Sequence, residues 1–197
     1  MKLIIGLGNP GKQYLQTRHN AGFRALDFLC EHFKFENFHQ ESRFHAEMSI
    51  GTVHGEKYLL IKPNTFMNQS GKTVHLLMQY YKLTPNDIIV LHDDLDIAPG
   101  LTKTTASSRA AGHNGVQNII DQLGTQDFFR IRLGIGRPLT SSQSPNIAPS
   151  TCQSTHDYVL EKFPAAERIL LESLFSSLPG LIAKISSGQL GTSQRIS

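Results

Sequence analysis

Four short apolar runs, separated by segments with helical spacing, constrain the fold of this chain most strongly. The runs are LIIGL at residues 3–7, YLLI at 58–61, IIVL at 88–91 and FRIRLGI at 129–135. Apolar runs of this length, alternating with amphipathic helices, are typical of the buried strands of α/β proteins. We therefore predict an α/β fold: a single domain with a twisted mixed β-sheet flanked by helices.

The segments between these runs repeat apolar residues every three to four positions, as the buried face of a helix does. We predict helices near residues 21–33, 70–81 and 115–123, with Asn20 as the N-cap of the first. Residues 43–53 and 56–61 are predicted to form a hairpin, and 157–163 and 165–185 a terminal helical region. Because 197 residues can bury one good core, we expect one catalytic domain over 1–185 and a tail, 186–197, that frays.

Composition narrows the class of protein further. We find no apolar run of membrane-spanning length, and the N-terminus reads as a strand and not as a signal peptide, so a cytoplasmic protein is expected. Cys30 and Cys152 lie far apart without metal-binding spacing, which favours reduced thiols, with Cys30 in the core. The segment 139–155 is rich in Ser, Thr and Pro and predicts a mobile surface loop.

The first apolar run leads into GLGNPG, residues 6–11, whose glycines have the G-x-G-x-x-G spacing of dinucleotide-binding loops. In those folds a helix starts at the glycine turn, and an acidic residue ends the next strand about 20 residues on. Here the helical pattern starts only near Ala21, and the acidic candidates Asp27 and Glu31 lie within it. We therefore interpret the glycines as a tight turn at a strand end that presents Asn9.

Polar residues gather where predicted strands end and helices begin. They are His19 in TRHN, Asn68 in TFMN, Asp93 in LHDD, and His113 and Asn114 in GHNG. A histidine with a carboxylate behind it can take a proton from water, and asparagine amides can stabilise a carbonyl oxygen that gains charge. Since no motif for a serine or cysteine nucleophile is present, water activated by the histidine is the simplest attacking group.

Two other interpretations of polar and charged residues stay open. A metal site could be built from the set His19, His92, Asp93, Asp94 and His113, although no pair has the spacing of H-E-x-x-H. Between residues 101 and 138 the basic residues Lys103, Arg109, Arg130, Arg132 and Arg137 outnumber Asp121 and Asp127. This excess is either a solvated positive face or a surface for a polyanion, and a net charge of +3 alone does not decide between them.

Five motifs together resemble the bacterial-type peptidyl-tRNA hydrolases. They are GLGNPGKQYLQTRHNAGF, KPNTFMNQSGK, HDDLDIAPG, AGHNGVQNII and FFRIRLGIGRP, in that order between about Lys2 and Pro138. The resemblance implies a monomeric esterase without metal or other cofactor and without an obligate protein partner. It implies cleavage of the ester between a peptide and the 3′-terminal ribose of tRNA, which recycles tRNA from aborted translation.

The resemblance also implies roles for individual residues. His19 corresponds to the general base and Asp93 to its orienting partner. Asn9, Asn68 and Asn114 correspond to asparagines that hold the peptide backbone, the 3′ end and the attacking water. Tyr14, Met67 and His113 correspond to residues that line the cleft. Lys103 and Arg132 match positions that contact tRNA phosphate.

This chain departs from the family pattern beside the cleft. Where the family usually has a glycine-rich loop, residues 106–111 read ASSRAA, so we expect a stiffer loop. The family often has a second basic residue two after Lys103, where this chain has Thr105; we expect a weaker grip on tRNA or its relocation to Arg109. The rivals are a silent tRNA-binding module and a metal-dependent hydrolase, and a peptidyl-tRNA assay with and without EDTA separates all three.

Overall fold

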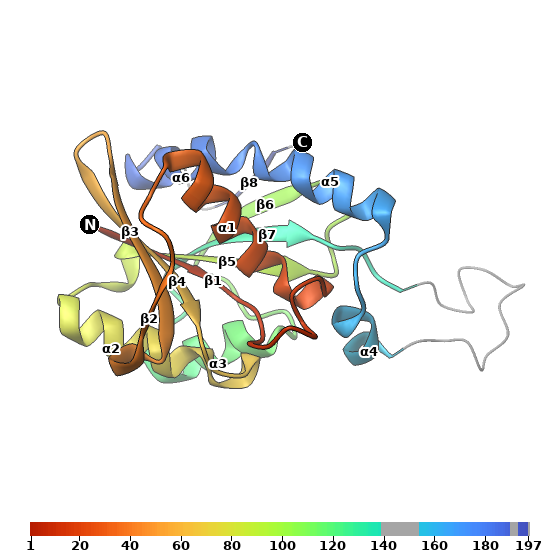
Figure 1. Ribbon diagram of the computed structural model, residues 1–197, viewed down its shortest axis with the longest axis horizontal. Coiled ribbons are helices and arrows are strands. Elements are labelled where there is room, and N and C mark those ends of the chain that lie inside the picture. The colour runs from red at the N-terminus through yellow and green to blue at the C-terminus, as the bar shows by residue number, and fades with distance from the viewer. Residues whose placement is uncertain (139–153, 190–192, 197) are drawn as a thin grey trace, which may run out of the picture.

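One mixed β-sheet organises the computed structural model, which describes residues 1–138, 154–189 and 193–196 (Figure 1). The strand order is β2-β3-β4-β1-β5-β7-β6-β8. The strands are β1 Lys2–Gly6, β2 His39–Glu41, β3 Ala46–Val53, β4 Glu56–Pro63, β5 Ile88–Asp94, β6 Thr102–Ala106, β7 Phe129–Gly134 and β8 Ser193–Ile196. Parallel pairing joins β4, β1, β5 and β7, and antiparallel pairing adds the strands at both sides. The predicted mixed α/β sheet is confirmed.

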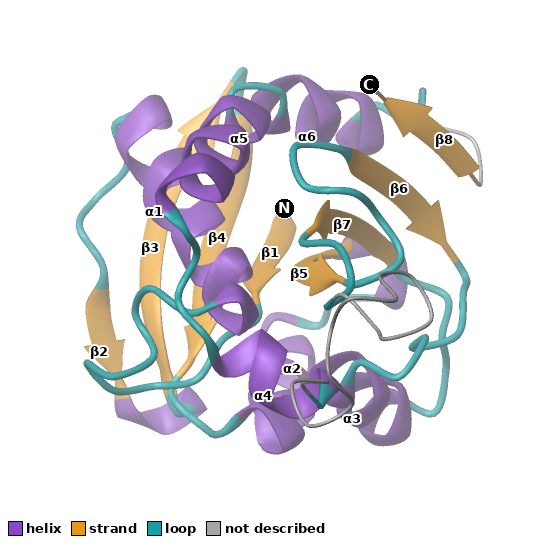
Figure 2. Ribbon diagram, turned by 90° about the vertical axis from the view of Figure 1, so that its right-hand side faces the viewer, coloured by secondary structure: helices purple, strands orange, loops and turns teal. Residues whose placement is uncertain are grey.

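Helices cover both faces of the sheet (Figure 2). On one face lie α1 Ala21–Phe33, α5 Ala165–Phe175 and α6 Leu178–Ser186; on the other lie α2 Ser70–Tyr81 and α3 Asn114–Leu123. The short helix α4 is Thr155–Leu160, and the 3₁₀ turns are η1 Arg18–Asn20, η2 Ser42–Phe44, η3 Met67–Gln69 and η4 Pro85–Asp87. Alternate residues of β1, β4 and β5 enter the two cores, which explains why these strands read as continuous apolar runs.

The helix α1 packs directly onto the backbone of the central strands. A Cβ atom at Gly22 would lie 2.4 Å from the backbone nitrogen of Leu7 and from the carbonyl oxygen of Leu91. A Cβ at Gly6 would lie 2.4 Å from the carbonyl oxygen of Gly22. This close approach places η1, the turn just before α1, at the carboxyl end of β5.

Most predicted elements appear at the predicted places. Two predicted helices match α1 and α2, and the third begins one residue early, at Asn114. The hairpin forms between β3 and β4, with His54 and Gly55 both at positive φ as a type I′ turn requires. The terminal region consists of α4, α5 and α6, whose bounds differ from those predicted.

Two predictions for the C-terminal region are corrected. Within the tail predicted to fray, Ser193–Ile196 pair with β6 as β8. The stretch Ala165–Ser186 is long and apolar enough to cross a membrane by length and composition, contrary to our prediction of no such run. It contains two helices, α5 and α6, whose buried residues, Leu171, Leu174, Phe175, Leu178, Leu181, Ile182 and Ile185, belong to the core on the α1 face. One face of this stretch therefore packs against the core, and 39% of its apolar window is buried.

Cys30 is buried, as predicted, and its thiol lies 3.4 Å from the hydroxyl oxygen of Ser49. Cys152 and residues 139–153 of the predicted surface loop lie outside the described residues. The last two residues of that predicted loop, Ser154 and Thr155, begin α4, with Ser154 as its N-cap.

Candidate active site

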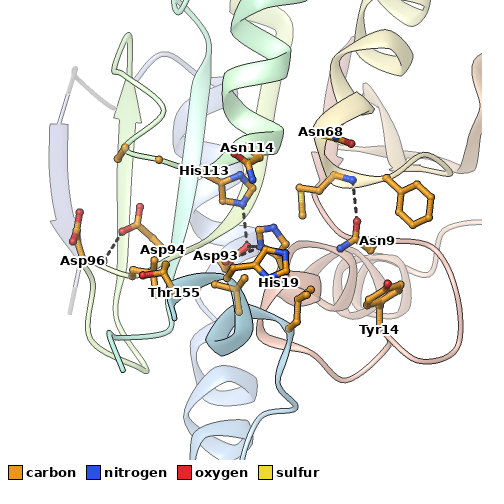
Figure 3. Close-up of a pocket in the computed structure, with 18 of the residues that line it drawn as sticks. Asn9, Tyr14, His19, Asn68, Asp93, Asp94, Asp96, His113, Asn114 and Thr155 are labelled. Carbon is orange, nitrogen blue, oxygen red and sulfur yellow. Dashed lines mark hydrogen bonds and ion pairs between the residues drawn. The ribbon is translucent and has the colours of Figure 1, made fainter. Parts of the chain in front are cut away.

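A cleft of about 770 Å³ opens where β1 and β5 end (Figure 3). Its walls come from the turn after β1, from η1 and η3, from the end of β5, from the segment before α3 and from α4. The predicted site residues that line it are Asn9, Tyr14, His19, Met67, Asn68, Asp93, His113 and Asn114. Motifs that lie far apart in the sequence therefore meet in one cleft.

His19 and Asp93 form a buried pair on the floor of this cleft. The Nδ1 atom of His19 lies 3.0 Å from both carboxylate oxygens of Asp93. Burial alone would raise the pKa of the Asp93 carboxyl, but the charge and hydrogen bonds of His19 and His113 outweigh it and hold the pKa well below its usual range. Because an ionised carboxylate can only accept, His19 carries its proton on Nδ1, and Nε2 keeps a lone pair for a substrate or water.

Asp93 in turn affects the basicity of His19. Burial lowers the pKa of the imidazole, whereas the charge of Asp93 and the hydrogen bond to it raise the pKa, and the net direction is upward. The side chain of His19 is only 11% exposed. This histidine is thus a base held in one tautomer, with its basicity set by one carboxylate.

His113 contacts the same carboxylate from the other side. Its Nε2 lies 3.0 Å from Oδ1 of Asp93, while its Nδ1 accepts hydrogen bonds from the backbone N–H groups of Gly115 and Val116 at 3.2 and 3.3 Å. Since Nδ1 accepts, the proton is on Nε2 and is donated to Asp93. His113 is also the N-cap of α3.

His92, the residue before Asp93, is buried beneath this network. Its Nδ1 donates to the carbonyl oxygen of Asp93 at 2.7 Å, and its ring packs edge-on against the ring of His113 at 4.7 Å. Burial lowers the pKa of His92 well below the ordinary value for histidine. His92 is therefore a neutral residue that fixes the backbone of Asp93.

Asn9 is fixed by a reciprocal pair of hydrogen bonds with Asn20. The backbone N–H of Asn9 donates to Oδ1 of Asn20 at 2.9 Å, and Nδ2 of Asn20 donates to the carbonyl oxygen of Asn9 at 3.0 Å. Oδ1 of Asn9 accepts from the backbone N–H of Met67 at 2.9 Å, which leaves its Nδ2 as a donor. Asn20 stands at the N-cap position of α1, but its side chain makes no capping bond, because it holds the turn that carries Asn9.

Asn68 on η3 and Asn114 at the start of α3 both line the cleft at its exposed entrance (Figure 3). Both are exposed, and within the described part of the chain neither side chain forms a hydrogen bond. Gly115 leaves space for Met67, since a Cβ at Gly115 would lie 2.5 Å from the Met67 sulfur. Because the side-chain amides of Asn68 and Asn114 have no partner among the described residues, they can serve as donors to a bound carbonyl.

Arg18, next to His19, ties the cleft to the C-terminal helices. Its guanidinium is 4% exposed and donates to Glu161 at 3.2 Å and to Glu167 at 3.1 Å. It also lies 4.0 Å from the centre of the Tyr158 ring, and its backbone N–H donates to the carbonyl oxygen of Glu161 at 2.9 Å. Sequence reasoning missed Arg18, because its partners lie more than a hundred positions away and no motif marks them.

Of the residues in the alternative metal site, only three offer ligand atoms to a common point. Atoms of His19, Asp93 and His113 lie within 4.8 Å of one another. His92 is engaged with the Asp93 backbone, and Asp94 pairs with Arg132. In the group of three, Nδ1 of His113 is occupied by amides, and both imidazole N–H groups point at Asp93. The group forms a hydrogen-bonded network.

Comparison with known proteins agrees with this geometry. A family model described as peptidyl-tRNA hydrolase matches residues 3–195. The chain belongs to the peptidyl-tRNA hydrolase family. A peptidyl-tRNA hydrolase of Brevibacillus brevis is 44% identical over 176 residues, which cover 89% of this chain and 86% of that protein. One of Oceanobacillus iheyensis is 45% identical over 167 residues, covering 85% of this chain and 82% of the relative.

Comparison of the fold with solved structures agrees with the family assignment. The crystal structure of peptidyl-tRNA hydrolase from Acinetobacter baumannii matches with a TM-score of 0.84 at 31% identity. The match covers 96% of this chain and 90% of that chain. The recognition from five motifs is thereby confirmed.

Of the basic residues in this peptidyl-tRNA hydrolase family member that were predicted to form a positive face, Arg137 lines the cleft and pairs with Asp96. The others, Lys103, Arg109, Arg130 and Arg132, lie outside the cleft lining. Lys103 on β6 stands opposite Arg132 on β7, and Nε of Arg132 donates to Asp94 at 2.6 Å. Arg109 is exposed in the loop before α3, and like Lys103 it forms no ion pair with any described residue. Arg130 is 1% exposed and does not belong to a positive face; burial lowers its pKa to about 10.

The loop that departs from the family pattern, residues 106–111, contains strained positions. Ser107 and Ala111 have φ values of +54° and +49°, in the left-handed region that glycine adopts without steric cost. Ala111 also lines the cleft, two residues before His113. The chain keeps a loop conformation suited to glycine while it carries larger residues.

Several residues that line the cleft were not predicted. Phe66 and Gln69 flank the TFMN asparagine, and Leu95 follows the aspartates at the end of β5. Their positions next to predicted residues are a signal that could have found them. Four more come from α4: Thr155, His156, Val159 and Leu160. Val159 and Leu160 lie in DYVLEKF, where the resemblance to the family resumes only weakly.

Proposed function

We propose that this chain hydrolyses the ester between a peptide and the 3′-terminal ribose of tRNA by water that His19 activates. Nε2 of His19 takes a proton from water, and the resulting hydroxide forms a bond to the ester carbonyl carbon. When the tetrahedral intermediate collapses, the ribose oxygen leaves and takes the proton from His19. The products are tRNA with a free terminal hydroxyl and a peptide carboxylic acid, which loses the second proton of the water to solvent and becomes a carboxylate.

One observation carries this proposal: the ionised Asp93 accepts the Nδ1–H of His19 and thereby leaves Nε2 as the base. The carboxylate also stabilises the imidazolium that forms when water loses its proton. Without such a partner, a buried histidine would lose basicity, as His92 does.

The asparagines supply the polar contacts of the reaction. Asn68 and Asn114 have free amides at the entrance, so they can bind the attacking water or the carbonyl oxygen as it gains charge. Asn9 offers its Nδ2 to the peptide backbone, because its other polar atoms are occupied. Tyr14 and Met67 line the cleft beside the peptide.

Lys103, Arg132 and Arg109 are proposed to bind phosphates of the acceptor arm. Support comes from Lys103 and Arg109, which have no carboxylate partner in the described chain, and from the cross-strand position of Arg132 beside Lys103. Phosphate contacts position a nucleic acid without taking part in the bond that breaks. The enzyme is proposed to act as a cytoplasmic monomer, without cofactor or obligate partner.

A peptidyl-tRNA assay with and without EDTA tests the proposal. We expect release of tRNA that is unchanged by the chelator and lost in His19→Ala. Binding without release would favour the silent tRNA-binding module. Loss of activity in EDTA, with recovery on addition of a divalent ion, would favour the metal-dependent hydrolase.

A further inference from the structure

Asp93 has two imidazole partners, although the reaction needs only one. Nδ1 of His19 and Nε2 of His113 both lie 3.0 Å from the same carboxylate oxygen, Oδ1. The side chains of Asp93 and His113 are only 3% and 7% exposed. The hydrogen bond from His113 to Asp93 is therefore buried within the fold and shielded from solvent.

His113 has no freedom to act as an acid or base. Its lone pair on Nδ1 is occupied by the amides of Gly115 and Val116, and its single N–H points at Asp93. Its ring lies between the rings of His19 and His92, at 4.9 and 4.7 Å. The helix start fixes the tautomer of His113, and the tautomer directs its N–H to the carboxylate.

We propose that His113 is a positioning residue that fixes the carboxylate of Asp93 and limits how strongly Asp93 attracts a proton to His19. The first effect is geometric, because two donors from different elements hold the carboxylate in one plane. The second is electrostatic, because each N–H donated to a carboxylate oxygen offsets part of its negative potential. This inference rests on the proposed role of His19 as the base.

The other charged groups around His19 do not change the direction in which loss of the His113 hydrogen bond should shift the pKa of His19. On β5 and just after it, Asp94 and Asp96 pair with Arg132 and Arg137. His92 is neutral behind His113, and Arg18 on η1 faces Glu161 and Glu167. The exposed His156 of α4 and Tyr14 line the cleft, and both stay in place in the variants below.

Two variants separate the two hydrogen-bonding functions of His113. In His113→Asn the amide oxygen can take the place of Nδ1 and cap α3, but the side chain is too short to reach Asp93. In His113→Gln the amide nitrogen can take the place of Nε2 and reach Asp93, but the cap is lost. The cap contributes to stability, whereas the bond to Asp93 acts on His19.

The experiment measures kcat/KM against pH for the wild type and both variants, together with thermal unfolding and the titration of the His19 ring by NMR. For His113→Asn we expect nearly unchanged Tm, lower kcat, and an acid limb and His19 titration shifted upward by about 0.3 to 1 pH unit. For His113→Gln we expect a lower Tm with the acid limb near that of the wild type. The NMR titration also reports the coupling independently of turnover.

The outcomes distinguish failure of this inference from failure of the proposed function. If the wild type releases tRNA and both variants keep the wild-type acid limb and His19 titration, His113 does not tune His19 and the inference is overturned. If both variants lose stability and activity in parallel without a shift, His113 is only structural, which also overturns it. If the wild type is inactive, or His19→Ala stays active, the proposed function itself fails.

Discussion

The cleft and a cationic edge, which consists of Lys103 on β6 and Arg109 in the loop after β6, are built differently. In the cleft, the side chains of His19, Asp93 and His113 are nearly buried and are joined to one another by hydrogen bonds through the Asp93 carboxylate. At the edge, Lys103 and Arg109 are more exposed and unpaired among the described residues. Groups held in place by hydrogen bonds can stabilise a transition state, whereas exposed surface charges act on encounter and binding.

This difference separates two kinds of kinetic effect. Substitutions in the cleft should act on kcat, because we propose that those groups contact the reacting atoms or orient a group that does. Substitutions at the edge should act on KM and on its salt dependence, because phosphate contacts position the substrate. A cleft substitution that changed KM alone, or a substitution at the edge that lowered kcat, would contradict this separation.

The largest effect is expected for His19→Ala. Removal of the proposed general base should lower kcat by roughly 10²–10⁴-fold while the fold stays intact. Rates of tRNA release under saturating substrate, with circular dichroism as the control for folding, measure this. Near-normal kcat in a natively folded sample would show that the base lies elsewhere.

Asp93→Asn should act on the same step as His19→Ala. Since the charge of Asp93 raises the pKa of His19, the substitution should move the acid limb of the kcat/KM profile to lower pH and decrease kcat. The double variant should lose much less than the product of the two single losses. Losses that simply multiply would argue against a coupled pair.

Asn68→Ala and Asn114→Ala test the free amides at the entrance. Each should lower kcat by roughly 10²–10³-fold if a whole contact to the developing oxyanion is lost. KM should change less. If both substitutions changed KM alone, these asparagines would be binding groups, and the boundary between the two regions would pass through the cleft itself.

The smallest effects are expected at the edge, for Lys103→Ala and Arg109→Ala. For each lost phosphate contact, the slope of log K against log salt should become shallower by roughly 0.7–0.9. A minimal peptidyl ester without the tRNA body should be cleaved equally by variant and wild type. Lys57→Ala, on β4 far along the strand order, is a matched control for loss of one exposed cation.

The Arg109→Ala variant tests whether the charge of Arg109 replaces the basic residue that the family often has at the position of Thr105. If Arg109→Ala leaves both KM for full-length peptidyl-tRNA and the salt slope unchanged while Lys103→Ala alters them, Lys103 is the main contact of this region. Arg109 would then be a solvated charge.

The central fold could be predicted because its strands are buried on both faces. The runs beginning at Leu3, Tyr58 and Ile88 are apolar at nearly every position. Continuous apolar runs of this length are typical of strands that are covered on both faces. Strands β2, β6 and β8 were missed, since they are short and polar and their pairing partners define them. Local sequence contains no signal for a strand whose stabilisation comes from its neighbour.

The candidate site was also predictable only in part. Motifs predicted the residues that meet in the cleft, but not how their polar atoms are used. Asn20 reads as an N-cap, whereas its amide fixes Asn9. Arg130 reads as part of a positive face, whereas it is buried over the Phe128 ring. In both cases the partner lies within about a dozen positions, but the contact depends on side-chain orientation and burial, which only the folded structure shows.

The contacts of Arg18 have a consequence for the order in which the protein assembles. Arg18 hydrogen-bonds residues that lie 140 to 149 positions later, whereas most sheet contacts beside it form over shorter separations. Closing such a long loop costs more chain entropy than closing a short one, so contacts of high sequence separation tend to form late in folding. We therefore expect the turn that carries His19 to be fixed only after the sheet has formed and α4 and α5 have docked. An intermediate with a native sheet would then lack an ordered catalytic base, and activity would return more slowly than secondary structure during refolding.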